Sequence, residues 1–124
     1  MITLLIILTI LYLLALRGRT GHPLLRKLSQ WKYAHRGLHG NGVPENSMAA
    51  FEAAKNAGYG VELDVHLLQD GNLAVIHDSA LKRTTGADGK IEDLTTAQLA
   101  QHRLEGTDQT IPTFQQVLDL YAGK

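Results

Sequence analysis

Hydrophobic and polar positions divide the chain into an uncharged front segment and a longer region of mixed pattern. Residues 1–16 contain no charged side chain. A helix needs about 20 consecutive apolar residues to cross a bilayer core, so this run is slightly short. We expect a retained transmembrane anchor, with a cleaved secretory signal and a buried helix as the alternatives.

Residues 17–30 are expected to form a juxtamembrane linker, because they combine Gly, Pro and basic residues without a clean hydrophobic period. Residues 1–33 carry five basic groups and no acidic group, whereas residues 34–124 carry seven basic and twelve acidic groups. The formal net charge of zero therefore conceals +5 in front and −5 behind. By the positive-inside rule, we expect a single-pass cell-membrane protein with a cytoplasmic domain at residues 31–124.

The pattern between residues 31 and 57 predicts a strand followed by a helix. Residues 31–35 are a short strand candidate, and the Gly-rich loop that follows ends at Pro44. Asn46 stands where a helix N-cap is expected. The apolar stripe of the helix has helical spacing and consists of Ala50, Phe51, Ala54 and Ala57.

Residues 60–67 alternate between apolar and polar side chains, which predicts one strand with two different faces. The expected faces are Val61, Leu63, Val65 and Leu67 on one side and Glu62, Asp64 and His66 on the other. Asp70-Gly71 is a hairpin signal, and residues 72–77 are expected to return as a second strand. A two-residue turn would place His77 opposite Asp64, whereas a one-residue slip would place Asp78 there.

The rest of the chain predicts an irregular region followed by two capped helices. Residues 79–94 are punctuated by Gly, and a capping box at Thr95 precedes a short helix over 96–104. Thr113 caps the final helix, whose expected face is Phe114, Val117, Leu118 and Tyr121. This order of elements favours an α/β domain built on βα units. The absence of cysteine excludes a disulfide framework and thiolate metal sites.

Glu62, Asp64 and His77 are expected to cluster on one face of the hairpin. Neighbouring carboxylates repel each other unless a cation neutralises them, and oxygen ligands suit Mg²⁺ or Ca²⁺. A solvated strand face with incidental charges remains an alternative, as does a zinc site formed by Glu62, Asp64 and His66.

His35, Arg36 and Gly37 form a second group with chemical potential at the end of the first expected strand. The Arg36 guanidinium is suited to phosphate, and nearby glycines leave backbone amides accessible. Cleavage of a phosphodiester needs charge neutralisation, a base and an acid, which an arginine, a hard cation and two histidines would supply. No nucleotide-binding glycine fingerprint is present, and the acidic domain does not suggest a nucleic-acid partner.

The separate strings AHRG (34–37), PENS (44–47), AAFEAAKNAGYGVELDVHLLQDG (49–71), LAVIHDSALKRTTGADGKIEDLT (73–95) and IPTFQQVL (111–118) resemble the glycerophosphodiester phosphodiesterase family. The resemblance covers residues 33 to 122, and the uncharged front segment with its basic linker looks like the membrane-tethered bacterial members. It implies the N-terminal part of a TIM (β/α)8 barrel of the phospholipase-C-like phosphodiesterase type. The implied reaction is divalent-metal-dependent hydrolysis of small-molecule glycerophosphodiesters to glycerol 3-phosphate and an alcohol, in lipid metabolism.

The same resemblance implies roles for particular residues. His35 and His77 would be the general acid and base, and Glu62 and Asp64 would bind the divalent metal. Arg36 would hold the substrate phosphate, with Glu45 and Asn46 supporting the substrate-binding side of the site. No role is carried over to His66, because the family varies at this position.

One departure from the family concerns length. A barrel of this type takes about 250 residues, and residues 31–124 provide 94. We therefore expect a fragment of a longer protein that lacks a third metal carboxylate, and we expect the stretch alone to be unstable and of doubtful activity. A short product that has become an inactive membrane-tethered binding module is one alternative. A phospholipase on a related barrel is another.

Overall fold

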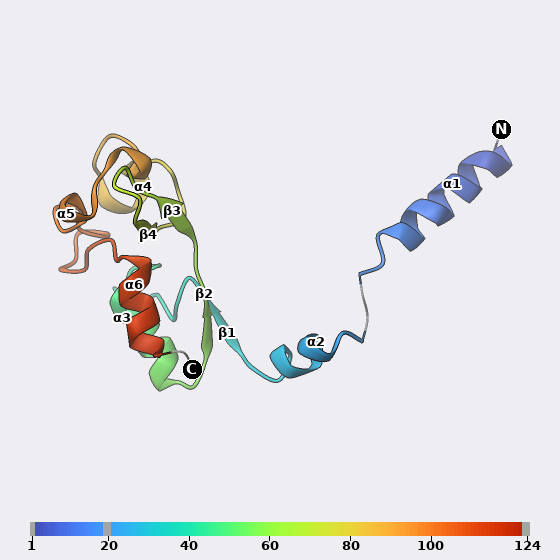
Figure 1. Ribbon diagram of the computed structural model, residues 1–124, viewed down its shortest axis with the longest axis horizontal. Coiled ribbons are helices and arrows are strands. Elements are labelled where there is room, and N and C mark those ends of the chain that lie inside the picture. Colours follow the sequence, from blue (N-terminus) through green and yellow to red (C-terminus); the bar gives the residue numbers. More distant parts are fainter. Residues whose placement is uncertain (1, 19–20, 123–124) are drawn as a thin grey trace. The chain divides into compact units, whose positions relative to one another are not determined.

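The computed structural model describes residues 2–18 and 21–122. The chain divides into two units, Met1–Trp31 and Lys32–Lys124, which are described separately (Figure 1). Met1 of the expected anchor lies outside the described residues. The same is true of Arg19 and Thr20 in the expected linker, and of Gly123 and Lys124 in the expected domain.

The described residues of the first unit form two helices, α1 (Ile2–Ala15) and α2 (Pro23–Leu28). None of the helices in the described part of the chain is both long and apolar enough to cross a membrane. α1 has 14 residues, and at about 1.5 Å of rise per residue it is shorter than a hydrocarbon core of about 30 Å. The expected transmembrane helix over residues 1–16 is therefore not supported.

The expected linker 17–30 includes a short helix that the sequence pattern did not predict. α2 begins with Pro23, whose missing N–H is no loss at a helix start, and His22 Nδ1 accepts a hydrogen bond from Leu24 N at 3.3 Å.

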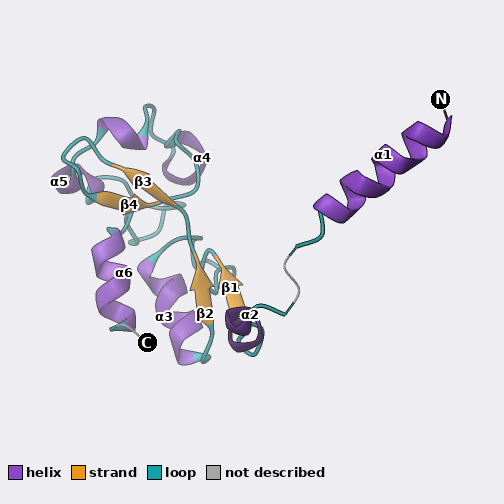
Figure 2. Cartoon of the chain, turned by 45° about the vertical axis from the view of Figure 1, so that its right-hand side comes forward, coloured by secondary structure: helices purple, strands orange, loops and turns teal. Residues whose placement is uncertain are grey.

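The second unit begins with a strand–helix–strand arrangement. β1 (Tyr33–His35) pairs in parallel with β2 (Gly60–Glu62), and α3 (Met48–Asn56) connects them (Figure 2). In the parallel register His35 lies beside Glu62, so both side chains stand at the carboxyl ends of their strands. This confirms the expected strand, helix and strand in that order.

The N-cap of α3 is Ser47, and the prediction of Asn46 was wrong. Ser47 has an extended backbone, and its Oγ accepts a hydrogen bond from Ala50 N at 3.1 Å. Asn46 has a φ of +52°, so it turns the chain before the helix begins. Of the expected apolar stripe, Ala50, Phe51 and Ala54 are fully buried, whereas Ala57 is exposed at the C-cap.

The expected strand over 60–67 is broken into two strands that belong to different sheets. β2 ends at Glu62, and β3 (Val65–Leu67) pairs with β4 (Leu73–Val75) in an antiparallel hairpin. Leu63 packs in the core, but Val65 and Leu67 are exposed, so the four apolar residues do not share one buried face.

The hairpin register also differs from the expected one. Val65 lies opposite Val75, and Leu67 lies opposite Leu73. Leu68 N donates to Asn72 O at 2.8 Å, and Gly71 N donates to Leu68 O at 3.0 Å, which makes a three-residue loop. Gly71 has a φ of +84°, a conformation that glycine adopts readily.

The physical cause of the three-residue loop lies partly outside the hairpin. The Asp70 carboxylate accepts a hydrogen bond from Thr96 N at 2.8 Å, which fixes the loop against α5 (Thr96–Leu99). As a result Ile76, and not His77, is the partner of Asp64, with Ile76 N donating to Asp64 O at 3.1 Å.

β4 contributes to two apolar clusters because successive side chains on a strand point to opposite sides. Val75 packs with Phe51 and Val117 between α3 and α6 (Phe114–Tyr121), which lie side by side in both views (Figures 1 and 2). The other cluster consists of Leu68, Ala74, Ile76, Leu81, Ile91, Leu99, Leu104 and Ile111. The two clusters fix the end of β4, where His77 follows.

The capping boxes at Thr95 and Thr113 are both present. The helix expected over 96–104 is only four residues long, and the region expected to be irregular contains α4 (Lys82–Thr85) and a 3-10 turn at Ile91–Asp93. In α6, Leu120 packs in the core, whereas Leu118 of the expected face is exposed.

Candidate active site

The carboxyl ends of β1 and β2 bring His35 and Glu62 together. His35 Nε2 lies 3.7 Å from Glu62 Oε2, and the His35 side chain is 69% exposed. Arg36 N donates to Glu62 O at 2.9 Å, which continues the strand pairing by one step. This edge is therefore open to solvent while its backbone is held by the sheet.

Arg36 turns away from the strand and into a group of acidic side chains. Its backbone φ is +55°, and its side chain is only 18% exposed. Nη1 donates to both carboxylate oxygens of Glu45, at 3.1 and 3.2 Å. Nε lies 3.5 Å from Asp64 Oδ2, which is close enough for an ion pair but lacks hydrogen-bond geometry.

Gly37 allows this turn because no side chain fits there. Its φ is +80°, and a Cβ atom would lie 2.7 Å from Ala50 Cβ and 2.9 Å from the Ala50 carbonyl carbon. The close approach packs the start of the loop against α3, where Leu38 N also donates to Ala50 O at 2.9 Å.

Asn46 links the loop to the strand end. The residue is 2% exposed, and its Nδ2 donates to Asp64 Oδ2 at 3.2 Å. Its Oδ1 is buried and accepts no hydrogen bond from the described residues. A buried acceptor of this kind is available to a ligand donor or a water molecule.

His77 is connected to Arg36 through a chain of charged side chains. His77 Nδ1 lies 2.6 Å from Asp78 Oδ1, and Arg83 Nε donates to Asp78 Oδ2 at 2.5 Å. Arg83 Nη2 donates to Glu45 Oε1 at 2.6 Å, and Glu45 is the carboxylate that binds Arg36.

These contacts change the pKa of two carboxyl groups. The hydrogen bonds from Arg83 and His77 lower the pKa of Asp78 from 3.8 to about 2. Partial burial alone would raise the pKa of Glu45, but the hydrogen bonds and charges of Arg83 and Arg36 outweigh it and hold that pKa below its usual value. Both groups are therefore ionised at neutral pH.

His66, which received no role from the sequence, supports the strand end that carries His77. Its Nδ1 lies 2.6 Å from Glu92 Oε1, and its Nε2 lies 3.0 Å from His77 O. Desolvation opposes the charged ring, but the contacts with His77 O and Glu92 prevail and raise the pKa of His66. Because both nitrogens face acceptors, these contacts favour the protonated form of the ring.

Glu62 Oε2 accepts a hydrogen bond from Arg36 N at 3.3 Å, and Asp64 Oδ2 lies 3.5 Å from Arg36 Nε, but the expected cluster of these two acids with His77 is not found. Across residues 2–18 and 21–122, no three His, Asp or Glu side chains are grouped as a metal site would require. The zinc site considered for Glu62, Asp64 and His66 is therefore not formed, and both ring nitrogens of His66 are engaged elsewhere. Two carboxylates are present, which is the number that Mg²⁺ often takes from a protein.

All seven sequence-predicted residues lie in one connected region, although by other contacts than expected. His35 pairs with Glu62, and the Arg36 group contains Glu45, Asn46 and Asp64. Among the described residues, His77 is joined to them through Asp78 and Arg83, which have no predicted role. Asp78 adjoins His77 and so could have been noticed, but no spacing rule connects Arg83 with Glu45.

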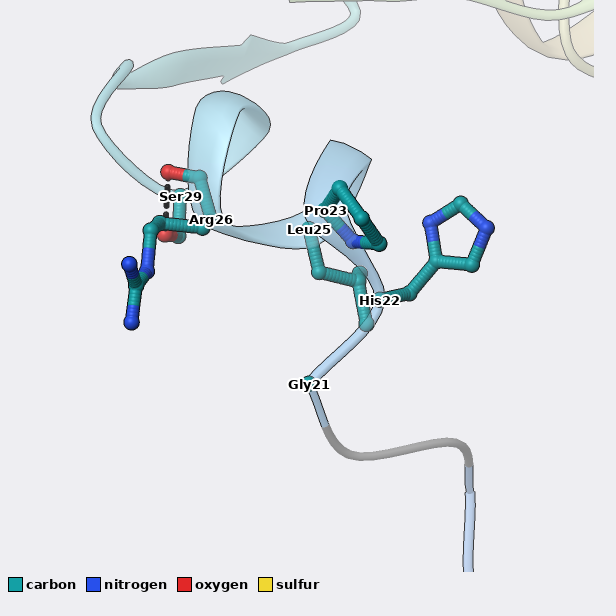
Figure 3. A pocket seen from close by; sticks show the side chains of 6 residues that line it. All are labelled: Gly21, His22, Pro23, Leu25, Arg26 and Ser29. Carbon is teal, nitrogen blue, oxygen red and sulfur yellow. Dashed lines mark hydrogen bonds between the residues drawn. The ribbon is translucent and has the colours of Figure 1, made fainter.

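A surface hollow beside α2 contains none of these residues (Figure 3). It is lined by Gly21, His22, Pro23, Leu25, Arg26 and Ser29. All six are exposed, and Figure 3 shows the side chains of His22 and Arg26 pointing away from each other, so they do not converge on a common ligand.

The fold resembles those of solved phosphodiesterases. A glycerophosphoryl diester phosphodiesterase from Parabacteroides distasonis has a TM-score of 0.69 and 36% identity, covering 76% of this chain and 35% of its own. A phosphodiesterase from Oleispira antarctica, solved in complex with the product sn-glycerol-3-phosphate, has a TM-score of 0.66 and 33% identity, covering 77% of this chain and 42% of its own. The second unit is thus part of an α/β barrel of the phosphodiesterase class.

The sequence comparisons narrow this class to one family. A glycerophosphodiester phosphodiesterase from Bacillus altitudinis is 48% identical over 95 residues, which are 71% of this chain and 38% of that protein. The chain belongs to the glycerophosphoryl diester phosphodiesterase family, whose profile matches residues 35–124. It spans well under half the length of the relative from Bacillus altitudinis.

Proposed function

We propose that the protein is a metal-dependent phosphodiesterase, which hydrolyses glycerophosphodiesters to glycerol 3-phosphate and an alcohol in lipid metabolism. The observation that carries this proposal is the position of Arg36, half-buried between Glu45 and Asp64 at the carboxyl ends of two parallel strands. Family membership and the product bound by the Oleispira relative support the same substrate class.

Arg36 binds the phosphate group of the substrate. A guanidinium held by carboxylates on one side keeps its orientation, and its planar donors match phosphate oxygens. Glu45 provides this support through both of its oxygens, and Asn46 holds Asp64 in place. Together they fix the phosphate before the reaction begins, which lowers the entropic part of the barrier.

His35 and His77 carry out the proton transfers. One takes the proton of the attacking hydroxyl, and the other protonates the leaving alkoxide. Because His77 Nδ1 faces the Asp78 carboxylate, Nδ1 carries a proton and Nε2 is the atom that exchanges a proton with the substrate. His35 is the more exposed of the two rings, and it lies beside Glu62.

Glu62 and Asp64 hold a divalent cation, Mg²⁺ or Ca²⁺. Their donor set is made only of oxygen, and Mg²⁺ commonly takes one or two carboxylates and completes its shell with water and phosphate oxygens. The cation supplies Lewis-acid neutralisation of the phosphate charge when it is bound. Asp64 is already oriented by Asn46.

The front unit attaches the protein to the cytoplasmic face of the cell membrane in this proposal. All of the helical residues of α1 are exposed and uncharged, and residues 1–33 carry basic groups but no acid. Membrane fractionation tests this: recovery of the protein in the soluble fraction at low salt would contradict it.

The proposed reaction is tested with protein produced from the natural gene. We expect Mg²⁺- or Ca²⁺-dependent release of glycerol 3-phosphate from glycerophosphocholine, and loss of at least 100-fold in kcat for His77→Ala, as is common for acid–base residues at about 10²–10⁴-fold. The matched control is Lys82→Ala, because Lys82 pairs with the exposed Asp88. Activity that survives excess EDTA, or that His77→Ala leaves unchanged, would refute the mechanism. Hydrolysis of lysophosphatidylcholine without hydrolysis of glycerophosphocholine would favour the alternative function, a phospholipase on a related barrel.

A further inference from the structure

Arg83 contacts two carboxylates that come from different parts of the second unit. Its Nε donates to Asp78 Oδ2 at 2.5 Å, and its Nη2 donates to Glu45 Oε1 at 2.6 Å. Both bonds are short and charge-assisted, which makes them stronger than neutral hydrogen bonds. Two different nitrogen atoms of one planar group therefore tie the two acids together.

Each of these carboxylates also binds a residue with a proposed role in the reaction. Asp78 uses its other oxygen, Oδ1, to contact His77 Nδ1 at 2.6 Å. Glu45 accepts two hydrogen bonds from Arg36 Nη1. The orientation of the His77 ring and of the Arg36 guanidinium thus depends on acids that Arg83 holds.

The short helix α4 explains why Arg83 reaches these acids. Leu81 and Thr84 are buried, at 1% and 3% exposure, so they fix one side of the helical turn in the core. Leu81 packs with Ile76 and Ile91, which places the turn close to the end of β4. Gly86 ends the helix with a φ of +75°. Arg83 therefore projects from an anchored turn, although its own side chain is partly exposed.

We propose that Arg83 is a positioning residue that fixes the His77 imidazole relative to the Arg36 guanidinium by bridging Asp78 and Glu45. This inference rests on the proposed function, because it assumes that His77 transfers protons and that Arg36 binds the phosphate. A carboxylate at Nδ1 sets the ring orientation of a histidine, and that carboxylate must itself be held. Lysine cannot replace the bridge, because its ammonium is a point charge without a planar fork.

The kinetic test compares Arg83→Ala with Lys82→Ala, its neighbour on the same helix. Lys82 has the same charge, but it pairs with the exposed Asp88 at 3.1 Å and does not contact the site. We expect Arg83→Ala to lower kcat by about 10- to 100-fold, the usual cost of losing a supporting partner, with KM changed by less than about twofold. Lys82→Ala should leave both constants within about twofold of the wild type, as expected for an exposed ion pair.

The lysine variant separates positioning from charge. Arg83→Lys keeps the positive charge and the aliphatic stem, so it also serves if Arg83→Ala fails to fold. We expect Arg83→Lys to lose most of the same kcat, because it can hold only one of the two carboxylates. A kcat equal to that of the wild type in either variant would overturn the proposal. A rise in KM with unchanged kcat would also overturn it, since it would make Arg83 a substrate-binding residue.

A second readout does not depend on turnover. The ¹⁵N and ¹H signals of the His77 ring report its hydrogen bond at Nδ1, and we expect them to shift in Arg83→Ala and Arg83→Lys but not in Lys82→Ala. If the protein has no phosphodiesterase activity, the proposed function fails, while a shift of these signals still supports the bridge. If the protein is active and the signals are the same in all variants, the bridge is wrong and the proposed function stands.

Discussion

The two halves of the candidate site are held in different ways. The strand-end half, residues 32–62, carries His35, Arg36 and Glu45, and it is fixed by parallel strand pairing and by packing of Gly37 on α3. The hairpin half, residues 65–94, carries His77. Its backbone is held by an apolar cluster that includes Leu68, Ile76 and Leu81, but the His77 side chain is held by the ion pairs of Asp78 and Arg83.

This difference has a consequence for mutations. Glu45 is 13% exposed, whereas the side chains of His77 and Arg83 are 43% and 47% exposed. Buried backbone and core contacts contribute strongly to stability, but exposed ion pairs contribute little. Changes of buried side chains in either half should therefore disturb the fold, whereas changes at the exposed ion pairs of the hairpin half should mainly disturb the reaction.

The largest expected loss of stability comes from Phe51→Ala. Phe51 is fully buried and packs with Val75 and Val117, so its removal leaves a cavity beneath the strand-end half. We expect the free energy of unfolding to fall by about 3–5 kcal/mol. Urea denaturation followed by circular dichroism measures this loss, and a loss below about 1 kcal/mol would show that α3 does not carry the fold.

Alanine substitution of one glycine in each half compares the stability of the two halves directly. Gly37→Ala combines a positive φ with a Cβ atom 2.7 Å from Ala50 Cβ, whereas Gly71→Ala has a positive φ but open space around it. We expect about 2–4 kcal/mol of destabilisation for Gly37→Ala, from strain and overpacking together. For Gly71→Ala we expect about 1–2 kcal/mol, from backbone strain alone.

Denaturation curves of the two alanine variants check this order. Equal losses would mean that the contact between Gly37 and α3 adds nothing, and a larger loss for Gly71→Ala would reverse the comparison between the halves.

The smallest effect is a pH dependence that belongs to the hairpin half. Folding lowers the pKa of Asp78 from 3.8 to about 2, so the folded state favours its ionised form. The resulting stabilisation is complete above about pH 4 and is lost as the pH falls through about 2. Asp78→Asn should therefore flatten the unfolding free energy between pH 4 and pH 2, measured by urea denaturation at each pH. If the unfolding free energy of Asp78→Asn falls as steeply between pH 4 and pH 2 as that of the wild type, Asp78 is not the source of this pH dependence.

The same contrast explains how much of the molecule the sequence predicts. In the strand-end half, local signals predict a strand that reaches His35, a helix with Phe51 on its buried face, and a strand that begins at Gly60, but they do not predict that this strand ends at Glu62. Parallel strand ends bring such residues together without any knowledge of a turn. The N-cap was also misplaced, because Asn46 is used for Asp64 and Ser47 is the first residue with cap geometry.

In the hairpin half, contacts between residues far apart in the sequence determine the strand register and the position of His77, and local patterns do not predict either. The register depends on a loop that Asp70 fixes through Thr96 N, and a strand that alternates perfectly in sequence is divided between two sheets. His77 therefore reaches the site through Asp78 and Arg83 and not by facing Asp64. Ion pairs between residues far apart in sequence have no periodicity, so the sequence did not reveal Arg83.

The most direct test of the central claim is the affinity for glycerol 3-phosphate, measured by calorimetry in the presence of Mg²⁺. If Arg36 binds the phosphate, Arg36→Ala should weaken binding by at least about tenfold, the value of one charge-assisted hydrogen bond of about 1.5–3 kcal/mol. Lys82→Ala removes an equal charge outside the site and should leave the affinity within about twofold. Equal affinities for the wild type and Arg36→Ala, with both proteins folded by circular dichroism, would contradict the account.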